Sequence, residues 1–205
     1  MKSPSTKRSS AKDRILHAAA ELFHKQGFQL TSPDQVIEVS GTGKSQFYHY
    51  FKNKEGLVHE VLQFHLQRIE SGTARVNFEV GSWSELEEWF HRHIEFQKTF
   101  NMTRGCPIAT IGNDATLYDE LIRQDVALIL EVLRQKLLAF FLREKATGGL
   151  ARDANEEALA TFCIAAVHGA MLLGKVTRNS RPAELTISEA VAHIKRYATG
   201  SRGVP

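Results

Sequence analysis

Apolar residues recur every three to four positions along most of this chain, which is the spacing that places them on one face of an α-helix. Residues 15, 16, 19, 22 and 23 follow this spacing, and residues 57, 61, 62, 65 and 69 follow it again. Alternating runs typical of a strand are few. The pattern therefore predicts an all-α fold of about nine helices. We expect them near residues 12–26, 33–39, 44–50, 54–72, 82–100, within 101–113, and at 114–146, 154–176 and 183–198.

Short polar and glycine-containing segments separate the first three of these helices. The sequence Ser-Pro-Asp-Gln at residues 32–35 has the form of a capping box with proline in the first helical position. Gly41 provides a tight turn, and Phe47 and Phe51 are the inward-facing residues of the third helix. A short, glycine-containing connection between two short helices predicts a helix-turn-helix.

The segment from Gly41 to Tyr50 also allows a competing interpretation. Its Gly-Thr-Gly-Lys-Ser start is close to the end of a phosphate-binding loop, but the first glycine of that motif is replaced by Glu38. A carboxylate there would repel phosphate, and the residues before Gly41 are helical rather than a strand. A P-loop-like nucleotide-binding protein, or a helical enzyme, therefore remains only the alternative. The nine histidines form no convincing metal or catalytic pattern, so we expect no enzyme, cofactor or metal site.

Positive charge is concentrated at the start of the chain. Residues 1–54 hold nine Lys or Arg and four acidic residues, a net +5, whereas the whole chain is +3 and the rest therefore −2. This distribution favours a local surface for a polyanion. No apolar run approaches the about 18 residues needed to span a membrane, and we expect neither a signal peptide nor membrane binding. We therefore expect a cytoplasmic protein with reduced Cys106 and Cys163.

Residues 12–62 resemble the DNA-binding domain of TetR/AcrR-type transcriptional regulators. The resemblance rests on residues 14–23 (RILHAAAELF), Gly27-Phe28, Thr31-Ser32 and residues 47–57 (FYHYFKNKEGL). It implies a homodimer that places two recognition helices in successive major grooves of a palindromic DNA operator. It also implies a C-terminal domain that binds a small-molecule effector and then releases DNA, so that the protein acts as a repressor. Gly43, Ser45 and Gln46 depart from common family residues, which leaves the operator sequence open.

The expected organisation is a basic arm at residues 1–11, a DNA-binding domain at 12–53, an effector-binding and dimerisation domain at 54–199, and a tail at 200–205. Gln46 and Lys44 have the chemistry to read bases, and Lys54 and the start of the second helix are suited to phosphate. The predicted DNA contacts are Thr31, Ser32, Thr42, Gly43, Lys44, Ser45, Gln46, Tyr48, His49 and Lys54.

Effector and dimer contacts are expected in the C-terminal part. The predicted effector-binding residues are Phe96, Phe100, Met102, Cys106, Ile111, Phe162 and His168. Cations near Cys106, with Lys175 a candidate, would lower the pKa of its thiol and allow it to react with an electrophile. The last two helices carry small and apolar residues suited to an isologous dimer interface, with intrachain core as the other interpretation. The predicted interface residues are Ala165, Gly169, Leu172, Leu173, Ile187, Ala190, Val191 and Ile194.

Overall fold

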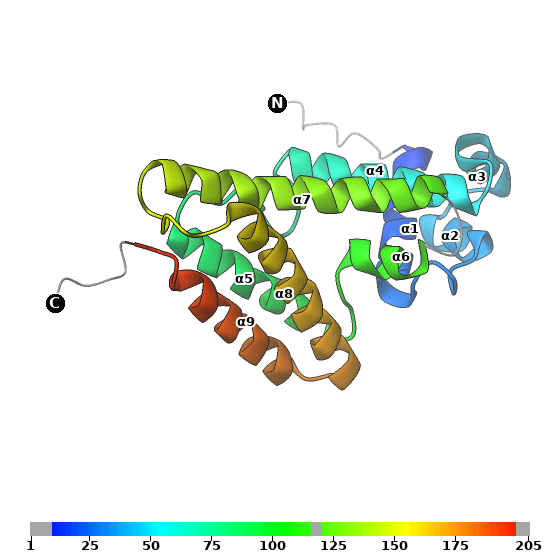
Figure 1. Ribbon diagram of the computed structural model, residues 1–205. Coiled ribbons are helices and arrows are strands. Elements are labelled where there is room, and N and C mark those ends of the chain that lie inside the picture. Colours follow the sequence, from blue (N-terminus) through cyan, green and yellow to red (C-terminus); the bar gives the residue numbers. More distant parts are fainter. Residues whose placement is uncertain (1–9, 116–119, 200–205) are drawn as a thin grey trace, which may run out of the picture.

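The computed structural model describes residues 10–115 and 120–199, and in this part of the chain helices are joined by turns and irregular segments, with one isolated bridge between Leu150 and Ala198. Nine helices lie within these ranges (Figure 1). They are α1 (Ala11–Gln26), α2 (Pro33–Ser40), α3 (Lys44–Phe51), α4 (Lys54–Glu70), α5 (Trp83–Lys98), α6 (Pro107–Ala115), α7 (Glu120–Ala146), α8 (Glu156–Thr177) and α9 (Ser180–Lys195). The predicted all-α, helix-turn-helix fold is confirmed. The predicted arm, up to residue 9, and the tail from residue 200 lie outside the described residues.

Local capping defines the helices at the N-terminal end of the molecule. The Ser32 hydroxyl accepts a hydrogen bond from the backbone N–H of Gln35, and the Gln35 side chain accepts one from the N–H of Ser32. Gly41 ends α2 with φ of 61°, in the left-handed region that glycine adopts without a steric penalty. The Asn53 side chain caps α4 by accepting from the Gly56 N–H. These signals hold α2 and α3 in the short helix-turn-helix arrangement.

Two hydrophobic cores share the long helix α7. The first core contains residues of the four helices α1, α2, α3 and α4, of α6, and of the part of α7 from Ile122 to Leu133. The second joins α5, α8 and α9 with the part of α7 from Leu137 to Phe141. Figure 1 shows α7 running beside α4 at the helix-turn-helix end and reaching over α5, α8 and α9 at the other. The first core is therefore larger than the predicted domain of residues 12–53, because it includes α4 and half of α7.

A buried polar contact ties α4 to α7 within the first core. Asp125 is only 7% exposed, and its carboxylate accepts hydrogen bonds from His59 Nδ1 at 2.6 Å and from Gln63 Nε2 at 2.9 Å. A buried carboxylate is costly unless its oxygens are satisfied, so these partners fix the register of the two helices.

Three sequence expectations about the later helices are wrong. Residue 114, where a helix over 114–146 was predicted to begin, belongs instead to α6, and α7 spans Glu120–Ala146. Helix α8 begins at Glu156 rather than at residue 154, because the Asn155 side chain caps it by accepting from the Ala158 N–H. Helix α9 begins at Ser180 instead of after Pro182, with Asn179 as its cap.

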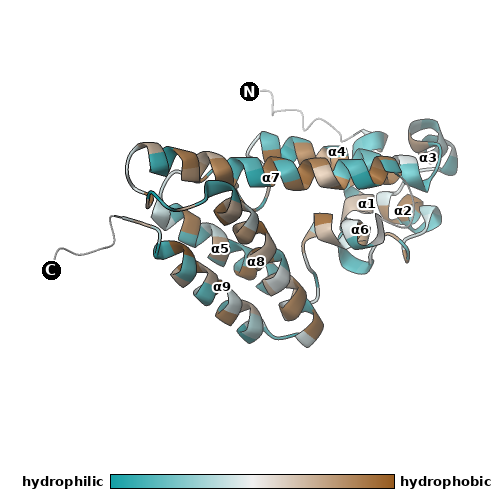
Figure 2. Ribbon diagram, in the orientation of Figure 1, coloured by the Kyte–Doolittle hydropathy of each residue, from teal (hydrophilic) through white to brown (hydrophobic). Residues whose placement is uncertain are grey.

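Helix α8 is the most apolar helix of the described chain. Its 22 residues are long and apolar enough to cross a membrane by length and composition alone, a test that the core helix of a globular protein also passes. Figure 2 shows hydrophobic residues along its ribbon, which lies near those of α5 and α9. Helix α8 packs against α5, α7 and α9, so part of this apolar surface belongs to the second core.

Candidate functional site

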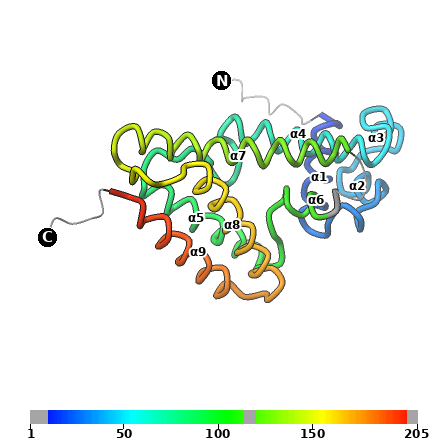
Figure 3. Tube along the Cα trace, in the orientation of Figure 1, coloured from blue at the N-terminus to red at the C-terminus, as the bar shows by residue number. Residues whose placement is uncertain are grey.

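Helix α3 presents a polar face to solvent at one end of the molecule, remote from the C-terminal end of α9 (Figure 3). Phe47 and Phe51 are 0% and 2% exposed and anchor α3 in the first core. The side chains between them point outward, and Tyr48 is 52% exposed. The exposed predicted DNA contacts on this helix are Lys44, Ser45, Gln46, Tyr48 and His49. Two buried aromatic residues thus orient a polar helix face outward.

The start of α3 is organised by contacts that sequence reasoning did not assign. The Gln46 side-chain oxygen accepts a hydrogen bond from the Gly43 N–H at 3.3 Å, so Gln46 caps its own helix in this state. Lys44 forms a 2.9 Å ion pair with Asp34 of α2, and both side chains are more than 70% exposed. This carboxylate raises the pKa of Lys44, which keeps the ammonium charged. An exposed pair of this kind is weak, so a phosphate can replace Asp34.

The predicted phosphate contacts differ in their availability. Ser32 is exposed at the start of α2, whereas Thr31 is 1% exposed and its hydroxyl donates to the Gly27 carbonyl at 2.8 Å. The Thr31 hydroxyl is therefore a buried structural group and not a surface contact. Thr42 is half-buried and hydrogen-bonded to Ser40 at 2.7 Å. Lys54 lies 4.1 Å above the Phe28 ring and donates to a backbone carbonyl, which holds its charge near the start of α2.

A cavity of about 230 Å³ lies where the two hydrophobic cores meet. Phe78 and Cys106 line it and pack against both cores. Its walls come from α1, α4, the segment between α4 and α5, α5, the start of α6, α7 and α8. The lining residues are His17, Ala20, Glu21, His24, Phe64, His65, Arg68, Ile69, Ala74, Arg75, Val76, Phe78, His93, Phe96, Phe100, Cys106, Pro107, Ile108, Leu133 and Met171.

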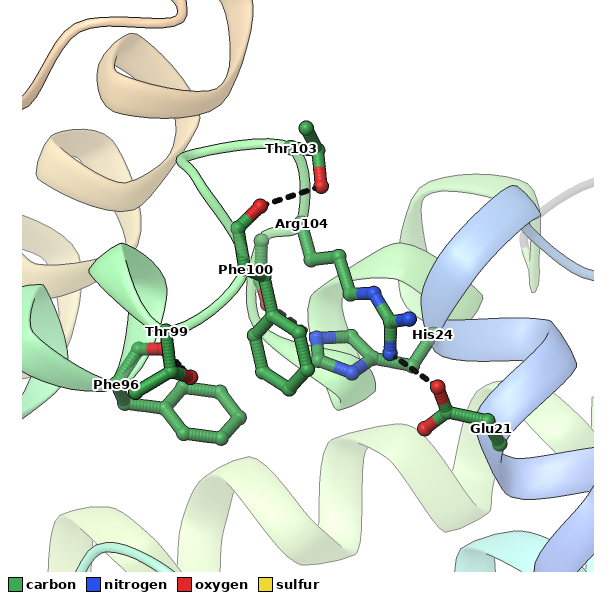
Figure 4. A network of polar contacts seen from close by, with 8 residues as sticks. Glu21, His24, Phe96, Thr99, Phe100, Thr103 and Arg104 are labelled. Atoms are coloured by element: carbon green, nitrogen blue, oxygen red, sulfur yellow. Dashed lines mark hydrogen bonds and ion pairs between the residues drawn. The ribbon is translucent and has the colours of Figure 1, made fainter.

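His24 connects α1 to the segment that joins α5 and α6, as Figure 4 shows. Its Nε2 donates to the Gly105 carbonyl at 2.8 Å, because a carbonyl can only accept. The ring stacks on Phe96 with 5.7 Å between centroids and meets Phe100 edge-on at 5.2 Å. Arg104 lies 4.2 Å from the Phe100 centroid and forms a 2.6 Å ion pair with Glu21 of α1 (Figure 4). These contacts thus join the cavity wall to α1, the helix against which α2 and α3 pack.

Burial keeps three histidines of the cavity, His24, His65 and His93, neutral near pH 7. Loss of solvent lowers the pKa of His24, and it lowers the pKa of His65 and His93 to about 4. The His93 Nδ1 donates to the Trp89 carbonyl at 2.8 Å, which fixes the position of its single proton. Arg68 adds to the lowering for His65, and Arg104 and Arg75 add to it for His24.

Cys106 lines the cavity, where burial acts against the expected activation of its thiol. Burial raises the pKa of Cys106, and the N–H groups of Ile108 and Ala109 offset only part of that effect. A raised pKa reduces the thiolate fraction, which is the opposite of what cations would produce. Lys175 lies close to the preceding residue, within about 4 Å of where a Cβ of Gly105 would stand.

The predicted effector-binding residues do not all meet in the cavity. Phe96, Phe100 and Cys106 line it, whereas Ile111 is 2% exposed in the first core and Met102 is 6% exposed outside the lining. His168 is half-buried and also lies outside the lining, and Phe162 is exposed on α8 beside His193. Periodicity identified these residues as apolar without indicating which helix each one faces.

The main residues that sequence reasoning missed come from α1 and α4, namely His24, His65 and Arg68, together with Arg75 before α5 and His93 on α5. A signal was present in the sequence, because His17 and His24 share a face of α1, and His65 and Arg68 share a face of α4. That signal does not indicate that the two faces meet.

Helices α8 and α9 divide the predicted dimer contacts into two groups. Ile187, Ala190 and Ile194 are at most 2% exposed and belong to the intrachain core, so their assignment to the surface is wrong. Val191 is half-buried and packs on the same core.

An apolar stripe runs along the outer side of α8. Leu172 is 55% exposed, and a Cβ added at Gly169 would meet no other atom within 4 Å. The stripe consists of Phe162, Ala165, Gly169, Leu172, Leu173 and Val176. Such a continuous exposed apolar surface is typical of an interaction site.

The helix-turn-helix head and the all-helical body with an internal cavity define a DNA-binding transcriptional regulator. Residues 15–61 match the family model of bacterial regulatory proteins of the tetR family, and residues 83–190 match the tetracyclin repressor-like C-terminal domain. The chain belongs to the TetR family of transcriptional regulators.

Similar proteins agree with this assignment. The HTH-type transcriptional regulator YxaF of Bacillus subtilis is 25% identical over 93% of this chain and 98% of its own length. The HTH-type transcriptional repressor DhaR of Mycobacterium sp. is 25% identical over 85% of this chain and 87% of its length. A solved TetR regulatory protein from Rhodobacter sphaeroides has a TM-score of 0.80 at 20% identity, covering 90% of this chain and 99% of its own.

Proposed function

We propose that this protein is a cytoplasmic repressor that binds a palindromic operator as a homodimer and leaves it when a small molecule occupies the cavity. The observation that carries this proposal is the position of the cavity. Its wall includes His24 and Glu21 of α1. Helices α2 and α3 also pack against α1. A ligand there is therefore in contact with the support of the DNA-reading helix.

The exposed face of α3 supports the DNA-binding role. Lys44, Ser45, Gln46, Tyr48 and His49 project from a helix that two buried phenylalanines hold in place. An α-helix fits the major groove, where amide and ammonium groups can read base edges. Binding requires Gln46 to exchange its bond with Gly43 for a base edge. The exposed N-cap Ser32, Lys54, Thr42 and Gly43 would flank this contact along the phosphate backbone.

The apolar stripe on α8 supports the homodimer. A two-fold pair of such stripes, joined by the exposed Leu185 of α9, would form a four-helix interface. Such a dimer places two α3 helices on the same side of a DNA duplex. Half-sites about 34 Å apart then correspond to one helical turn of DNA.

The salt dependence of DNA binding tests the proposed DNA-binding role directly. Binding of the full-length protein to DNA from the region upstream of its own gene is measured by fluorescence anisotropy between about 50 and 200 mM salt. Lys54→Ala should weaken binding to every operator variant to a similar extent. It should also reduce the slope of log K against log salt by about 0.9 for each phosphate contact that is lost.

Lys98→Ala is the matched control, because Lys98 is an exposed lysine of α5 that pairs with Glu95 and Glu184. It should leave both the affinity and the slope unchanged. Absence of salt-dependent binding in the wild type would contradict the repressor function. An unchanged slope in Lys54→Ala with altered sequence preference would contradict only the phosphate role of Lys54.

A further inference from the structure

Two arginines border the cavity without a carboxylate partner. Arg68 of α4 donates to the Thr73 carbonyl at 2.9 Å, and its guanidinium lies 5.4 Å from the Phe64 centroid. Arg75 is exposed, and its guanidinium lies 5.8 Å from the Phe96 centroid and 5.7 Å from that of Phe100. In the part of the chain that the structure describes, neither arginine forms an ion pair. Both guanidiniums therefore keep donors available for an anion.

The other charged group of the lining does not cancel this positive charge. Glu21 is the only carboxylate in the described lining, and it is already paired with Arg104 at 2.6 Å. His24 and His93 each donate a ring N–H to a backbone carbonyl and stay neutral in their buried positions. The charge available to a ligand is therefore that of the two arginines.

Beyond the arginines the lining is largely apolar and aromatic. Phe78, Phe96, Phe100, Ile69 and Leu133 contribute to its walls. At about 230 Å³ the cavity is smaller than the roughly 300–1,000 Å³ of sites for drug-sized ligands. It suits one ring with a short substituent. A flat apolar body would fit between the aromatic walls, with its charged end directed at the guanidiniums.

We propose that the cavity selects a small aromatic carboxylate, held by Arg68 and Arg75 at its anionic end and by Phe96 and Phe100 along its ring. This inference rests on the proposed function, since it names the chemical class of the effector. Arginine matches a carboxylate with two parallel N–H donors, and release of ordered water from the aromatic walls adds to the affinity. The carboxylate would draw Arg75, before α5, and Arg68, on α4, toward one ligand.

A matched set of probes tests the class. Phenylacetate, phenylacetamide and phenethylamine share a ring and a short chain and differ in charge. Their binding to the full-length wild type is measured by isothermal titration calorimetry. We expect phenylacetate to bind with a Kd below about 1 mM and at least about tenfold more tightly than the neutral amide, with no binding of the amine. Acetate, which lacks the ring, should not bind in this range.

Arginine variants locate the bound carboxylate. Arg75→Gln and Arg68→Gln should each weaken phenylacetate about fivefold or more while leaving phenylacetamide unchanged. Phe96→Ala should weaken both compounds alike. Arg92→Gln is the control, because Arg92 is an exposed arginine that pairs with Glu88 outside the cavity. The thermal unfolding of each variant is compared with that of the wild type to confirm that it folds.

The outcomes separate this inference from the repressor function. Equal binding of acid and amide, binding of the amine, no binding of phenylacetate, or indifference to both arginine variants would overturn the anion selectivity. Binding of phenylacetate that depends on the arginines supports the anion selectivity, whether or not the compound changes operator binding. If phenylacetate binds in the cavity but leaves operator binding unchanged, that result counts against effector-controlled release of DNA. Operator binding that only neutral compounds reverse would preserve the regulator and overturn the ligand class.

Discussion

Removing His93 should make the folded protein less sensitive to acid. His93 is 7% exposed, donates to the Trp89 carbonyl, and has its pKa lowered by burial to about 4. A histidine in the unfolded chain has a pKa of about 6.5. Below pH 6.5 the unfolded state therefore binds more protons than the folded state, and stability decreases. The contribution of His93 to the free energy of unfolding is therefore fully present above about pH 6.5, and it is lost as the pH falls from there toward 4.

The size of the effect follows from the two pKa values. At pH 5 nearly all unfolded chains carry a proton on His93, whereas about one folded molecule in ten does so. The linkage integral between pH 7.5 and pH 5 is then about 2 kcal/mol for His93. His65, whose pKa burial and Arg68 lower to about 4, adds at most a similar amount because its ring keeps some contact with solvent.

Urea unfolding at pH 7.5 and pH 5.0 measures this difference. Ionic strength and protomer concentration are kept constant, since subunit association contributes to the stability of a dimer. In His93→Gln the amide can still donate to the Trp89 carbonyl but does not titrate. The variant should lose about 2 kcal/mol less than the wild type between the two pH values. His91→Gln, an exposed position on the same helix, should behave as the wild type does.

The comparison of pH dependences decides the matter. If His93→Gln is less stable than the wild type by the same amount at both pH values, that loss reflects packing alone. The relevant quantity is the change in the free energy of unfolding of each protein between pH 7.5 and pH 5.0. An equal loss in the variant and the wild type from pH 7.5 to pH 5.0 would refute the conclusion that His93 is held neutral.

Two further predictions concern the dimer and the cysteine. Leu172→Glu places a charge on the exposed stripe of α8 and should convert the proposed homodimer into monomers, as measured by sedimentation velocity. Glu189→Gln, on the exposed side of α9, should leave the proposed dimer intact. An undiminished dimer in Leu172→Glu would contradict an interface on α8. Cys106 should react with iodoacetamide at pH 7 at least about tenfold more slowly than a free thiol, because burial raises its pKa. Selective and rapid labelling in a mass spectrum would restore the electrophile hypothesis.

Local chemistry allowed the sequence to predict the first three helices and the turns between them. Ser32, Gly41 and Asn53 act within a few residues of themselves, and each occupies its expected capping or turn position. The later boundaries had competing signals. Pro182 was interpreted as a helix breaker, but it occupies the third position of α9, where its missing N–H requires no intrahelical partner. Asn155 and Asp153 both have side chains suited to a cap, and Asn155 occupies the capping position of α8.

The cavity could be predicted only in part. Phe96 and Phe100 were both predicted as effector-binding residues, and both line the cavity with their rings edge-on at 5.3 Å between centroids. His24 belongs to the predicted DNA-binding domain, and the periodicity of α1 does not reveal that its C-terminal end meets α5. That contact depends on long-range packing of α1 against α6 and of α4 against α7. The predicted boundary between residues 12–53 and residues 54–199 therefore separates residues that line the same cavity.

The placement of α1 provides a physical route from the cavity to the reading head. Its C-terminal half contacts the α5–α6 segment through His24 and the Glu21–Arg104 pair, and near its N-terminal end Arg14 donates to the Ser40 carbonyl at the end of α2. A packed helix moves as a unit, so a displacement at one end reaches the other. A ligand releases DNA only if it binds more tightly to the displaced arrangement than to the DNA-bound one. The bond between His24 and the Gly105 carbonyl is then the contact whose geometry should differ most between the two states.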